Sequence, residues 1–272
     1  MFSDDQRRQF QEQGFVIVPR FFEKPEVEAM QAEIHRFQRT GLLRNVATQG
    51  DGTTHSAAKA NLQLCPMSPH SALFKTLPFA PKVVEAVSEL IGDPVILHLD
   101  QVFLKPARHG QGTNWHQDNA YFQIDDPLKG TAMWVAVHDA NIENGTLRVI
   151  PGSHRQTFEH SRDPYSDHHI RCYPPEESAE YAVMEAGGVI FFAYGVAHAT
   201  GSNNTDRDRA GAAFHFLNAE HIPSGHFKVA PNAATHPALS GPDADGGVVA
   251  YGEDLSHAWD RTVEDARLQP VS

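Results

Sequence analysis

The sequence predicts a mainly β fold flanked by α-helices. Amphipathic helical patterns occupy the first part of the chain, up to residue 93, and short β-branched or aromatic runs follow up to about residue 220. Gly, Pro, Asn and Asp separate these runs, which is typical of a β-sandwich or barrel. No stretch resembles a linker. We therefore expect a single domain over 1–272, with a helical part over about 1–93, a β core over about 94–220 and a C-terminal extension over 221–272.

The helical part begins with "SDDQRRQFQEQG", in which Ser3 can act as an N-cap and Gly14 as a stop. In 23–41 the apolar residues recur at intervals of three and four, which places them on one helical face. The stretch 80–93 predicts another amphipathic helix, ended by Gly92. Between the first two helices, "FVIVPRFF" has strand character. Residues 44–62 are polar and without periodicity, so we predict a loop.

Five runs from residue 95 onward predict the strands of the core. They are "VILHLDQVFLKP", "TAMWVAVHDA", "GTLRVIPGSH", "AVMEAGGVIFFAYGVAHAT" and "RAGAAFHFLNA". The pair Asn144–Gly145 is a turn signal between two of them. The last 50 residues return to a loop-like composition, with weak helical signs near the end.

Composition limits the classes of function. A net charge of −12 argues against nucleic acid and against anionic membrane surfaces as partners. No apolar run approaches the roughly 18 residues of a membrane span, and the start of the chain lacks an export pattern. Cys65 and Cys172 are far apart and form no CxxC pair, so we expect a reducing cytoplasm. No feature of the sequence indicates an oligomeric state.

The stretch "NWHQDNAYF" places His116 two residues before Asp118. In a strand, residues at this spacing point to the same side, so both side chains could reach one metal ion. His198, about eighty residues further along, is a candidate third ligand. Two histidines and one carboxylate leave three octahedral positions open, the arrangement of non-haem Fe(II) oxygenases. The alternative is a hydrogen-bonded surface pair, since His138–Asp139 and the "DHH" of 167–169 show how often such spacings arise by chance.

Arg209 follows His198 by eleven residues and leads into the next predicted strand. An oxygenase that uses 2-oxoglutarate must hold a distal carboxylate, and a guanidinium suits it because it is planar, bidentate and always charged. A hairpin would place Arg209 across from His198, and Thr200 could add a hydroxyl donor. Taken alone, Arg209 would be a surface charge.

These motifs resemble the phytanoyl-CoA dioxygenase family of Fe(II)- and 2-oxoglutarate-dependent oxygenases. The similarity is carried by "QEQGFVIVPRFFEKPEVEAMQAEI", "LKP" before "WHQDNAYF", "MWVAVHDANIENGTLRVIPGSHR" and "AHATGSNNTDRDRAG". The resemblance implies a double-stranded β-helix (jelly-roll, cupin-like) core. It also implies that His116, Asp118 and His198 bind Fe(II).

By the same resemblance, Arg209 and Thr200 would hold 2-oxoglutarate, Trp134 would pack beside it and Gln101 would lie near it. For Trp134 and Gln101 a purely structural role is equally open. The implied reaction uses O2 to hydroxylate an unactivated C–H bond of a small molecule, with release of succinate and CO2. Halogenating relatives replace the carboxylate ligand by a small residue, whereas Asp118 is present here, which favours hydroxylation.

Substrate contacts are harder to assign. We consider residues near the first two ligands, and one lysine in the loop 44–62 as an anion contact; each could equally support the fold. They are His109, Asn119, Tyr121, Phe122 and Lys59. The loop 44–62 and the segment 156–180 are long enough to act as lids.

Two other classes of protein remain open. One is a cupin-type metalloenzyme that uses the same three ligands without 2-oxoglutarate, which leaves Thr200 and Arg209 unexplained. The other is a non-catalytic barrel that binds a small ligand. The complete ligand set argues against the second class.

Overall fold

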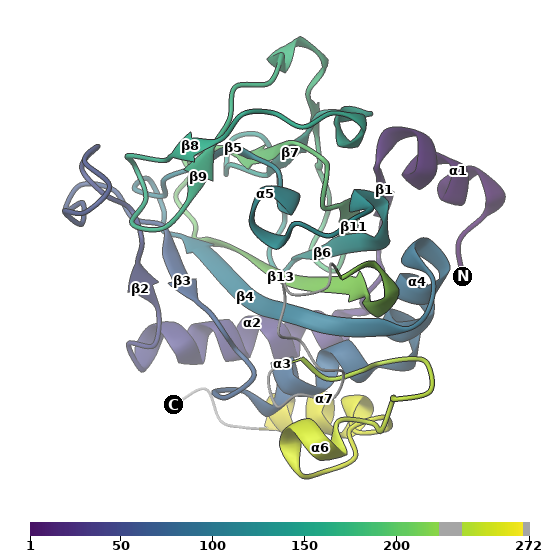
Figure 1. Cartoon of the computed structure of the whole chain (residues 1–272). Helices are drawn as coiled ribbons and strands as arrows, with labels where there is room; N and C mark the ends of the chain where they lie inside the picture. The colour runs from purple at the N-terminus through teal and green to yellow at the C-terminus, as the bar shows by residue number, and fades with distance from the viewer. Residues whose placement is uncertain (223–235, 269–272) are drawn as a thin grey trace.

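Two antiparallel β-sheets face each other, and helices cover the outer side of the larger sheet (Figure 1). The computed structural model describes residues 1–222 and 236–268. Its strands are β1 (Phe15–Val18), β2 (Arg44–Asn45), β3 (Leu62–Leu64), β4 (Val95–Lys105), β5 (Thr113–His116), β6 (Gly130–Ala136), β7 (Leu147–Val149), β8 (Ser161–Arg162), β9 (Ile170–Arg171), β10 (Glu180–Tyr181), β11 (Val189–Ala193), β12 (His198–Thr200) and β13 (Arg209–Asn218). Its α-helices are α1 (Asp4–Gln13), α2 (Lys24–Arg39), α3 (Ala72–Thr76), α4 (Pro81–Ile91), α5 (Asn119–Phe122), α6 (Val248–Tyr251) and α7 (Trp259–Leu268).

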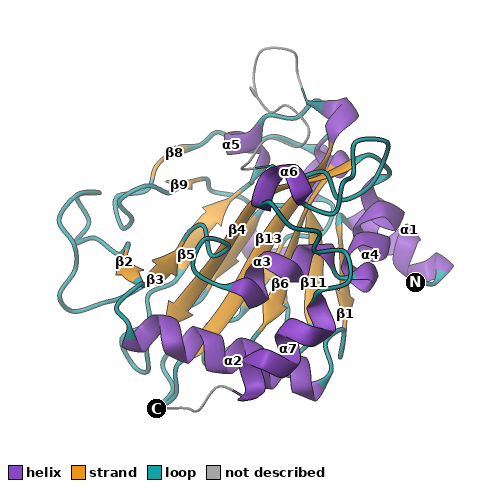
Figure 2. Ribbon diagram, turned by 90° about the horizontal axis from the view of Figure 1, so that it is seen from below, coloured by secondary structure: helices purple, strands orange, loops and turns teal. Residues whose placement is uncertain are grey.

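The larger sheet has the strand order β1-β11-β6-β13-β4-β3-β2, and the smaller sheet has the order β10-β7-β12-β5. The short strands β8 and β9 pair only with each other. Helices α2, α3 and α7 lie across the outer face of the larger sheet, as the view from below shows (Figure 2). The predicted mainly β fold with flanking helices is therefore confirmed. The strands form two facing sheets and not one closed barrel.

The predicted helices form where the sequence places their caps. The side chain of Ser3 accepts a hydrogen bond from the backbone N–H of Gln6, and Gly14 ends α1 with φ of 83°. A left-handed backbone conformation at this position favours glycine, because glycine has no Cβ. Helix α2 buries the apolar face predicted for it, and α4 ends at Gly92.

Helix α7 packs against α2 on the helical side. The indole N–H of Trp259 in α7 donates to a carboxylate oxygen of Glu26 in α2 at 2.5 Å. The ring of Trp259 also lies 6.1 Å from that of Phe22. The weak helical signs near the C-terminus thus correspond to α7. Parts of the predicted C-terminal extension, residues 223–235 and 269–272, lie outside the described residues, and the division into three segments stays a prediction.

Strand β13 lies at the centre of the larger sheet, between β6 and β4, and all ten of its residues are buried. It is buried on both faces because the helices cover one side and the smaller sheet faces the other. Phe214 of β13 points to the helical side, where its ring lies 6.4 Å from that of Phe74 in α3. Phe74 in turn contacts Phe37 of α2 at 5.8 Å. This aromatic row joins the helical layer to the sheet.

No helix among the described residues is long and apolar enough to cross a membrane.

The aromatic row makes Phe214 a test of this packing. Phe214→Ala removes a fully buried ring and leaves a cavity, so we expect a loss of about 3–5 kcal/mol in the free energy of unfolding. Urea denaturation followed by circular dichroism measures it. Tyr173→Ala, at a side chain 74% exposed, is the control and should change stability by less than about 0.5 kcal/mol. Equal effects of the two substitutions would contradict the packing described here.

Candidate functional site

The three predicted metal ligands come together between the two sheets. His116 is the last residue of β5 and His198 is the first residue of β12, and the two are directly opposite each other in the antiparallel pairing. Asp118 does not lie in the strand, as the spacing suggested. It has helical backbone angles and is the N-cap residue of α5. The expectation that a strand aligns His116 with Asp118 is therefore wrong; the turn that follows β5 brings the carboxylate back beside the imidazole.

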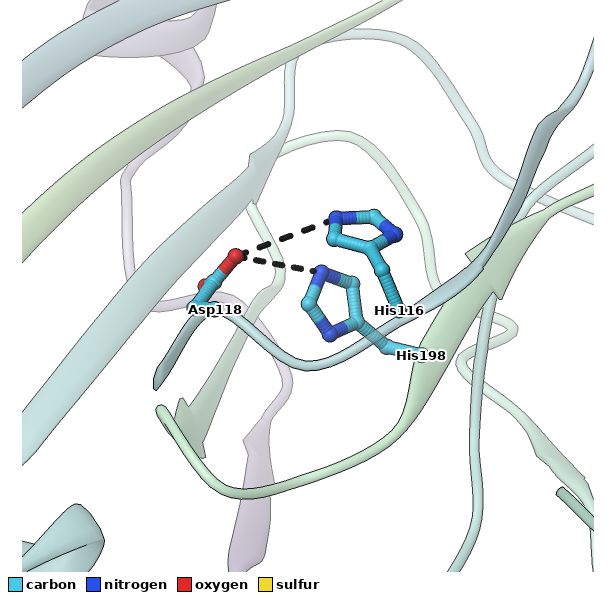
Figure 3. Close-up of side chains that lie close together, drawn as sticks. All are labelled: His116, Asp118 and His198. Carbon is cyan, nitrogen blue, oxygen red and sulfur yellow. Dashed lines mark ion pairs between the residues drawn. The ribbon is translucent and has the colours of Figure 1, made fainter. Parts of the chain in front are cut away.

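The carboxylate of Asp118 faces both imidazoles (Figure 3). Its Oδ1 lies 3.8 Å from Nε2 of His116 and 3.7 Å from Nε2 of His198. All three side chains are buried. Among residues 1–222 and 236–268, only these three side chains form a group of His, Cys, Asp or Glu whose ligand atoms all lie within 4.8 Å.

Backbone carbonyls determine which imidazole nitrogen is available. Nδ1 of His116 lies 2.8 Å from the carbonyl of Asn114, and Nδ1 of His198 lies 3.0 Å from that of Val196. A carbonyl only accepts, so each Nδ1 carries the proton and each Nε2 presents a lone pair toward Asp118. Histidines that bind metals usually donate their other N–H in this way.

The protonation states fit a bound cation. Burial lowers the pKa of His116 and of His198 to about 4, so both are neutral near pH 7. Burial raises the pKa of Asp118 to about 6, although His116 opposes the shift. A cation held by the three side chains would offset that cost, because it stabilises the carboxylate form. The donor set of two imidazoles and one carboxylate suits Fe(II).

A cavity adjoins these three side chains, and both sheets contribute to its lining. Six residues predicted for the metal or the cosubstrate line it: His116, Asp118, His198, Thr200, Gln101 and Trp134. The other lining residues are Phe103, Thr113, Leu147, His169, Phe192, Ala199, Ala213 and His215.

Arg209 does not lie across a hairpin from His198, as the sequence suggested. β12 belongs to the smaller sheet and β13 to the larger one, so the two residues come from facing sheets. The guanidinium is buried behind the cavity lining, 5.6 Å from the ring centre of Trp134. It donates to the carbonyls of Asn144, at 3.3 Å, and Gly145.

The indole ring of Trp134 lies against the backbone of Gly211. A Cβ at Gly211 would be 2.3 Å from the indole ring, so this close approach requires glycine.

Lys105 is a buried residue of the site that the sequence reasoning did not assign. Its Nζ donates to Oγ1 of Thr200 at 2.6 Å and to the carbonyl of Gly201 at 2.5 Å. Strand periodicity could have indicated it. Every second residue of a strand points to the same face, and Lys105 follows Gln101 and Phe103 at this spacing in β4.

His215 was also missed. Its Nδ1 lies 3.5 Å from Oδ2 of Asp118, and its Nε2 lies 3.3 Å from Nε2 of Gln101. Gln101 in turn accepts a hydrogen bond from Gln63 at 2.9 Å. Strand periodicity could again have indicated it. Arg209 and His215 are six residues apart in one strand, and an even separation places both side chains on the same face.

Three of the residues considered for substrate lie away from the cavity lining. Lys59 and His109 are exposed. The side-chain amide of Asn119 donates a hydrogen bond to the backbone carbonyl of Ile124 and accepts one from the backbone N–H of Ile124. Their substrate roles stay predictions.

The two aromatic candidates lie nearer to the metal ligands. The ring of Tyr121 is 6.2 Å from that of His116, and its hydroxyl accepts from the backbone N–H of Ile170. The ring of Phe122 packs edge-on to His215, at 5.4 Å. Neither residue lines the cavity itself.

The two segments expected to act as lids contact each other. The backbone N–H of Thr48 donates to the carbonyl of Tyr165 at 3.0 Å, and Arg44 pairs with Asp167 at 2.5 Å. The second segment also contributes His169 of the "DHH" at 167–169 to the cavity lining, a role that its sequence pattern does not indicate. The two segments therefore lie against each other, and their action as lids stays a prediction.

Comparison with known proteins agrees with this geometry. The model of the phytanoyl-CoA dioxygenase (PhyH) family matches residues 10–211. Ectoine dioxygenase of Bordetella bronchiseptica is 24% identical over 230 residues, which cover 76% of this chain and 73% of that protein. Peroxisomal phytanoyl-CoA dioxygenase of Rattus norvegicus is 23% identical over 231 residues, covering 79% and 68%.

Solved structures share the fold. The epimerase SnoN from nogalamycin biosynthesis, described as non-heme and α-ketoglutarate-dependent, matches with a TM-score of 0.70 and 19% identity. The match covers 88% of this chain and 98% of that chain. EctD from S. alaskensis, solved with 2-oxoglutarate and 5-hydroxyectoine, matches with a TM-score of 0.64 and 21% identity, covering 81% and 77%. The predicted jelly-roll fold is thereby confirmed. The chain belongs to the phytanoyl-CoA dioxygenase family of Fe(II)- and 2-oxoglutarate-dependent oxygenases, as its motifs predicted.

Proposed function

We propose that His116, Asp118 and His198 bind Fe(II), and that the protein hydroxylates an unactivated C–H bond of a small molecule. The observation that carries the proposal is the convergence of two unprotonated Nε2 atoms and one carboxylate oxygen on the same side of a cavity. Three protein ligands leave three octahedral positions for a chelating cosubstrate and O2.

We further propose that Arg209 and Thr200 hold the distal carboxylate of 2-oxoglutarate, with Trp134 and Gln101 beside it. Thr200, Trp134 and Gln101 line the cavity, and the Arg209 guanidinium is buried against the ring of Trp134. Within the described chain this guanidinium contacts two neutral carbonyls and makes no ion pair, so it retains donors for a ligand carboxylate.

In this mechanism the protein positions the reactants and excludes water. Bound iron and 2-oxoglutarate supply the activation of O2, with release of succinate and CO2. The backbone carbonyls of Asn114 and Val196 keep the two imidazoles in the tautomer that binds a metal. As lids, the segments 44–62 and 156–180 would limit access of water to the cavity, to whose lining the second segment contributes His169. No side chain needs to act as a general base.

The presence of Asp118 favours hydroxylation over halogenation, because its carboxylate takes the position that a halide would need. Similar folds support other outcomes, since SnoN is described as an epimerase. We propose a small-molecule substrate, as in the named relatives. Mass spectrometry of the product distinguishes the outcomes, because hydroxylation adds one oxygen atom.

We also propose a cytoplasmic location. The free cysteines Cys65 and Cys172 are in keeping with a reducing compartment.

His116→Ala should abolish Fe(II) binding and turnover, because it removes one of three ligands at a buried site. Anaerobic titration with Fe(II) and assay of succinate release measure the two effects. The matched control is His35→Ala, at an exposed position on α2, which should bind iron and turn over like the unmodified protein. Retained iron binding and turnover in His116→Ala would contradict the proposed ligand set.

Arg209→Ala should weaken 2-oxoglutarate binding, because it removes a buried charge-assisted contact that is worth about 2–5 kcal/mol, or at least about 30-fold in Kd. The readout is the weak visible charge-transfer band that appears when 2-oxoglutarate is added to the Fe(II) protein without O2. Arg207→Ala, at an exposed arginine two residues away, is the control. If iron binds but no band forms even in the unmodified protein, a cupin-type enzyme without 2-oxoglutarate becomes the better description.

A further inference from the structure

A row of four polar side chains crosses the larger sheet and ends beside Asp118. The polar row consists of Arg44, Gln63, Gln101 and His215, which come from the neighbouring strands β2, β3, β4 and β13. Arg44 is directly opposite Gln63 in the pairing of β2 with β3. The registers of β4 with β3 and β13 place Gln101 diagonally from Gln63 and from His215. Diagonal neighbours share a face of the sheet and are within reach of long side chains.

The hydrogen bonds along the polar row have one direction. The Arg44 guanidinium donates to Oε1 of Gln63 at 3.4 Å, and Nε2 of Gln63 donates to Oε1 of Gln101 at 2.9 Å. Nε2 of Gln101 lies 3.3 Å from Nε2 of His215. A guanidinium has donors only, so each amide turns its oxygen toward Arg44 and its nitrogen toward His215. Nε2 of His215 is therefore an acceptor, and the imidazole proton lies on Nδ1.

The protonated Nδ1 of His215 faces the carboxylate of Asp118. It lies 3.5 Å from Oδ2, whereas Oδ1 is the oxygen that faces His116 and His198. Both Nδ1 of His215 and Oδ2 of Asp118 are buried and have no hydrogen-bond partner among the described residues. A carboxylate that binds a metal ion is ionised, and ionised acceptors form shorter and stronger hydrogen bonds than neutral ones. The two unpaired atoms therefore complement each other when the site holds a metal.

We propose that His215 is a positioning residue for Asp118. Its Nδ1–H holds Oδ2, so that only Oδ1 is presented to Fe(II), and the rest of the polar row fixes the tautomer that this requires. A carboxylate that bound through both oxygens would take a fourth octahedral position and leave too few for a chelating cosubstrate and O2. This inference rests on the proposed function of the site.

A purely structural role makes the opposite demand on position 215. If His215 only ended the polar row, its essential atom would be Nε2, the acceptor for Gln101. If it positions Asp118, the essential atom is Nδ1. An asparagine amide can place its nitrogen where Nδ1 lies, whereas a glutamine amide, one methylene further out, reaches the place of Nε2.

The first test compares His215→Asn and His215→Gln with the unmodified protein. Anaerobic titration calorimetry with Fe(II) gives Kd, and urea denaturation of the metal-free proteins shows whether each variant folds. We expect His215→Gln to raise Kd for Fe(II) by about 10- to 100-fold, as loss of a partner of a metal ligand usually does, and His215→Asn by less than about 3-fold. The control is His35→Gln, at an exposed position on α2, which should leave Kd unchanged.

A second variant, Gln63→Glu, keeps the inference falsifiable if the His215 variants do not fold. Gln63 does not line the cavity. A glutamate has no N–H, so it accepts from Arg44 and must also accept from Gln101. The Gln101 amide then turns its oxygen toward His215, the imidazole proton moves to Nε2, and a lone pair faces Oδ2 of Asp118.

We expect Gln63→Glu to raise Kd for Fe(II) by about 10-fold or more. The added negative charge would by itself attract the cation more strongly, so the sign of the change separates the two effects. Gln11→Glu, at an exposed position on α1, is the control and should leave Kd unchanged.

The outcomes separate this inference from the proposed function. Absence of Fe(II) binding in the unmodified protein would remove the proposed function and this inference with it. If the unmodified protein binds Fe(II), an unchanged Kd in His215→Gln or in Gln63→Glu would overturn only the positioning role of His215. A rise in Kd for His215→Asn that equals or exceeds the rise for His215→Gln would also overturn it and indicate a histidine that only supports the sheet.

Discussion

The pairing of β12 with β5 is the contact on which the candidate site depends. It places His198 directly opposite His116, although about eighty residues separate them in the sequence. Each imidazole is then held by a backbone carbonyl of its own strand or of the turn before it. A shift of this register by one residue would turn His198 to the other face of the sheet. The geometry of the metal ligands is therefore a property of the smaller sheet.

The larger sheet contributes the other half of the site. β4 carries Gln101 and Lys105, and β13 carries Arg209 and His215. Because Lys105, Arg209 and His215 are buried, these polar side chains must find partners between the sheets. The site thus joins a ligand set on one sheet to a cationic pair on the other. A dicarboxylate that binds the metal at one end and Arg209 at the other would span the two sheets.

Burial explains the chemical state of the site. It keeps the imidazoles of His116 and His198 neutral, and it makes charge on Asp118, Lys105 and Arg209 costly in the absence of ligands. Bound Fe(II) and a bound dicarboxylate would each offset a different part of that cost. Binding at this site is accordingly expected to stabilise the folded protein.

The sequence by itself determined the class of fold, the helix boundaries at Gly14 and Gly92, the three candidate metal ligands and the family, because caps, periodicity and motif spacing are local signals. Only the tertiary structure decided that Asp118 lies in a turn after β5 and that Arg209 comes from the opposite sheet. It also brought in Lys105 and His215, which strand periodicity could have indicated, and His169, which no local pattern indicates because it comes from an irregular segment. Pairing between distant strands, and the burial that follows from it, depends on contacts between residues far apart in the chain. No single stretch of sequence contains the information that determines these contacts.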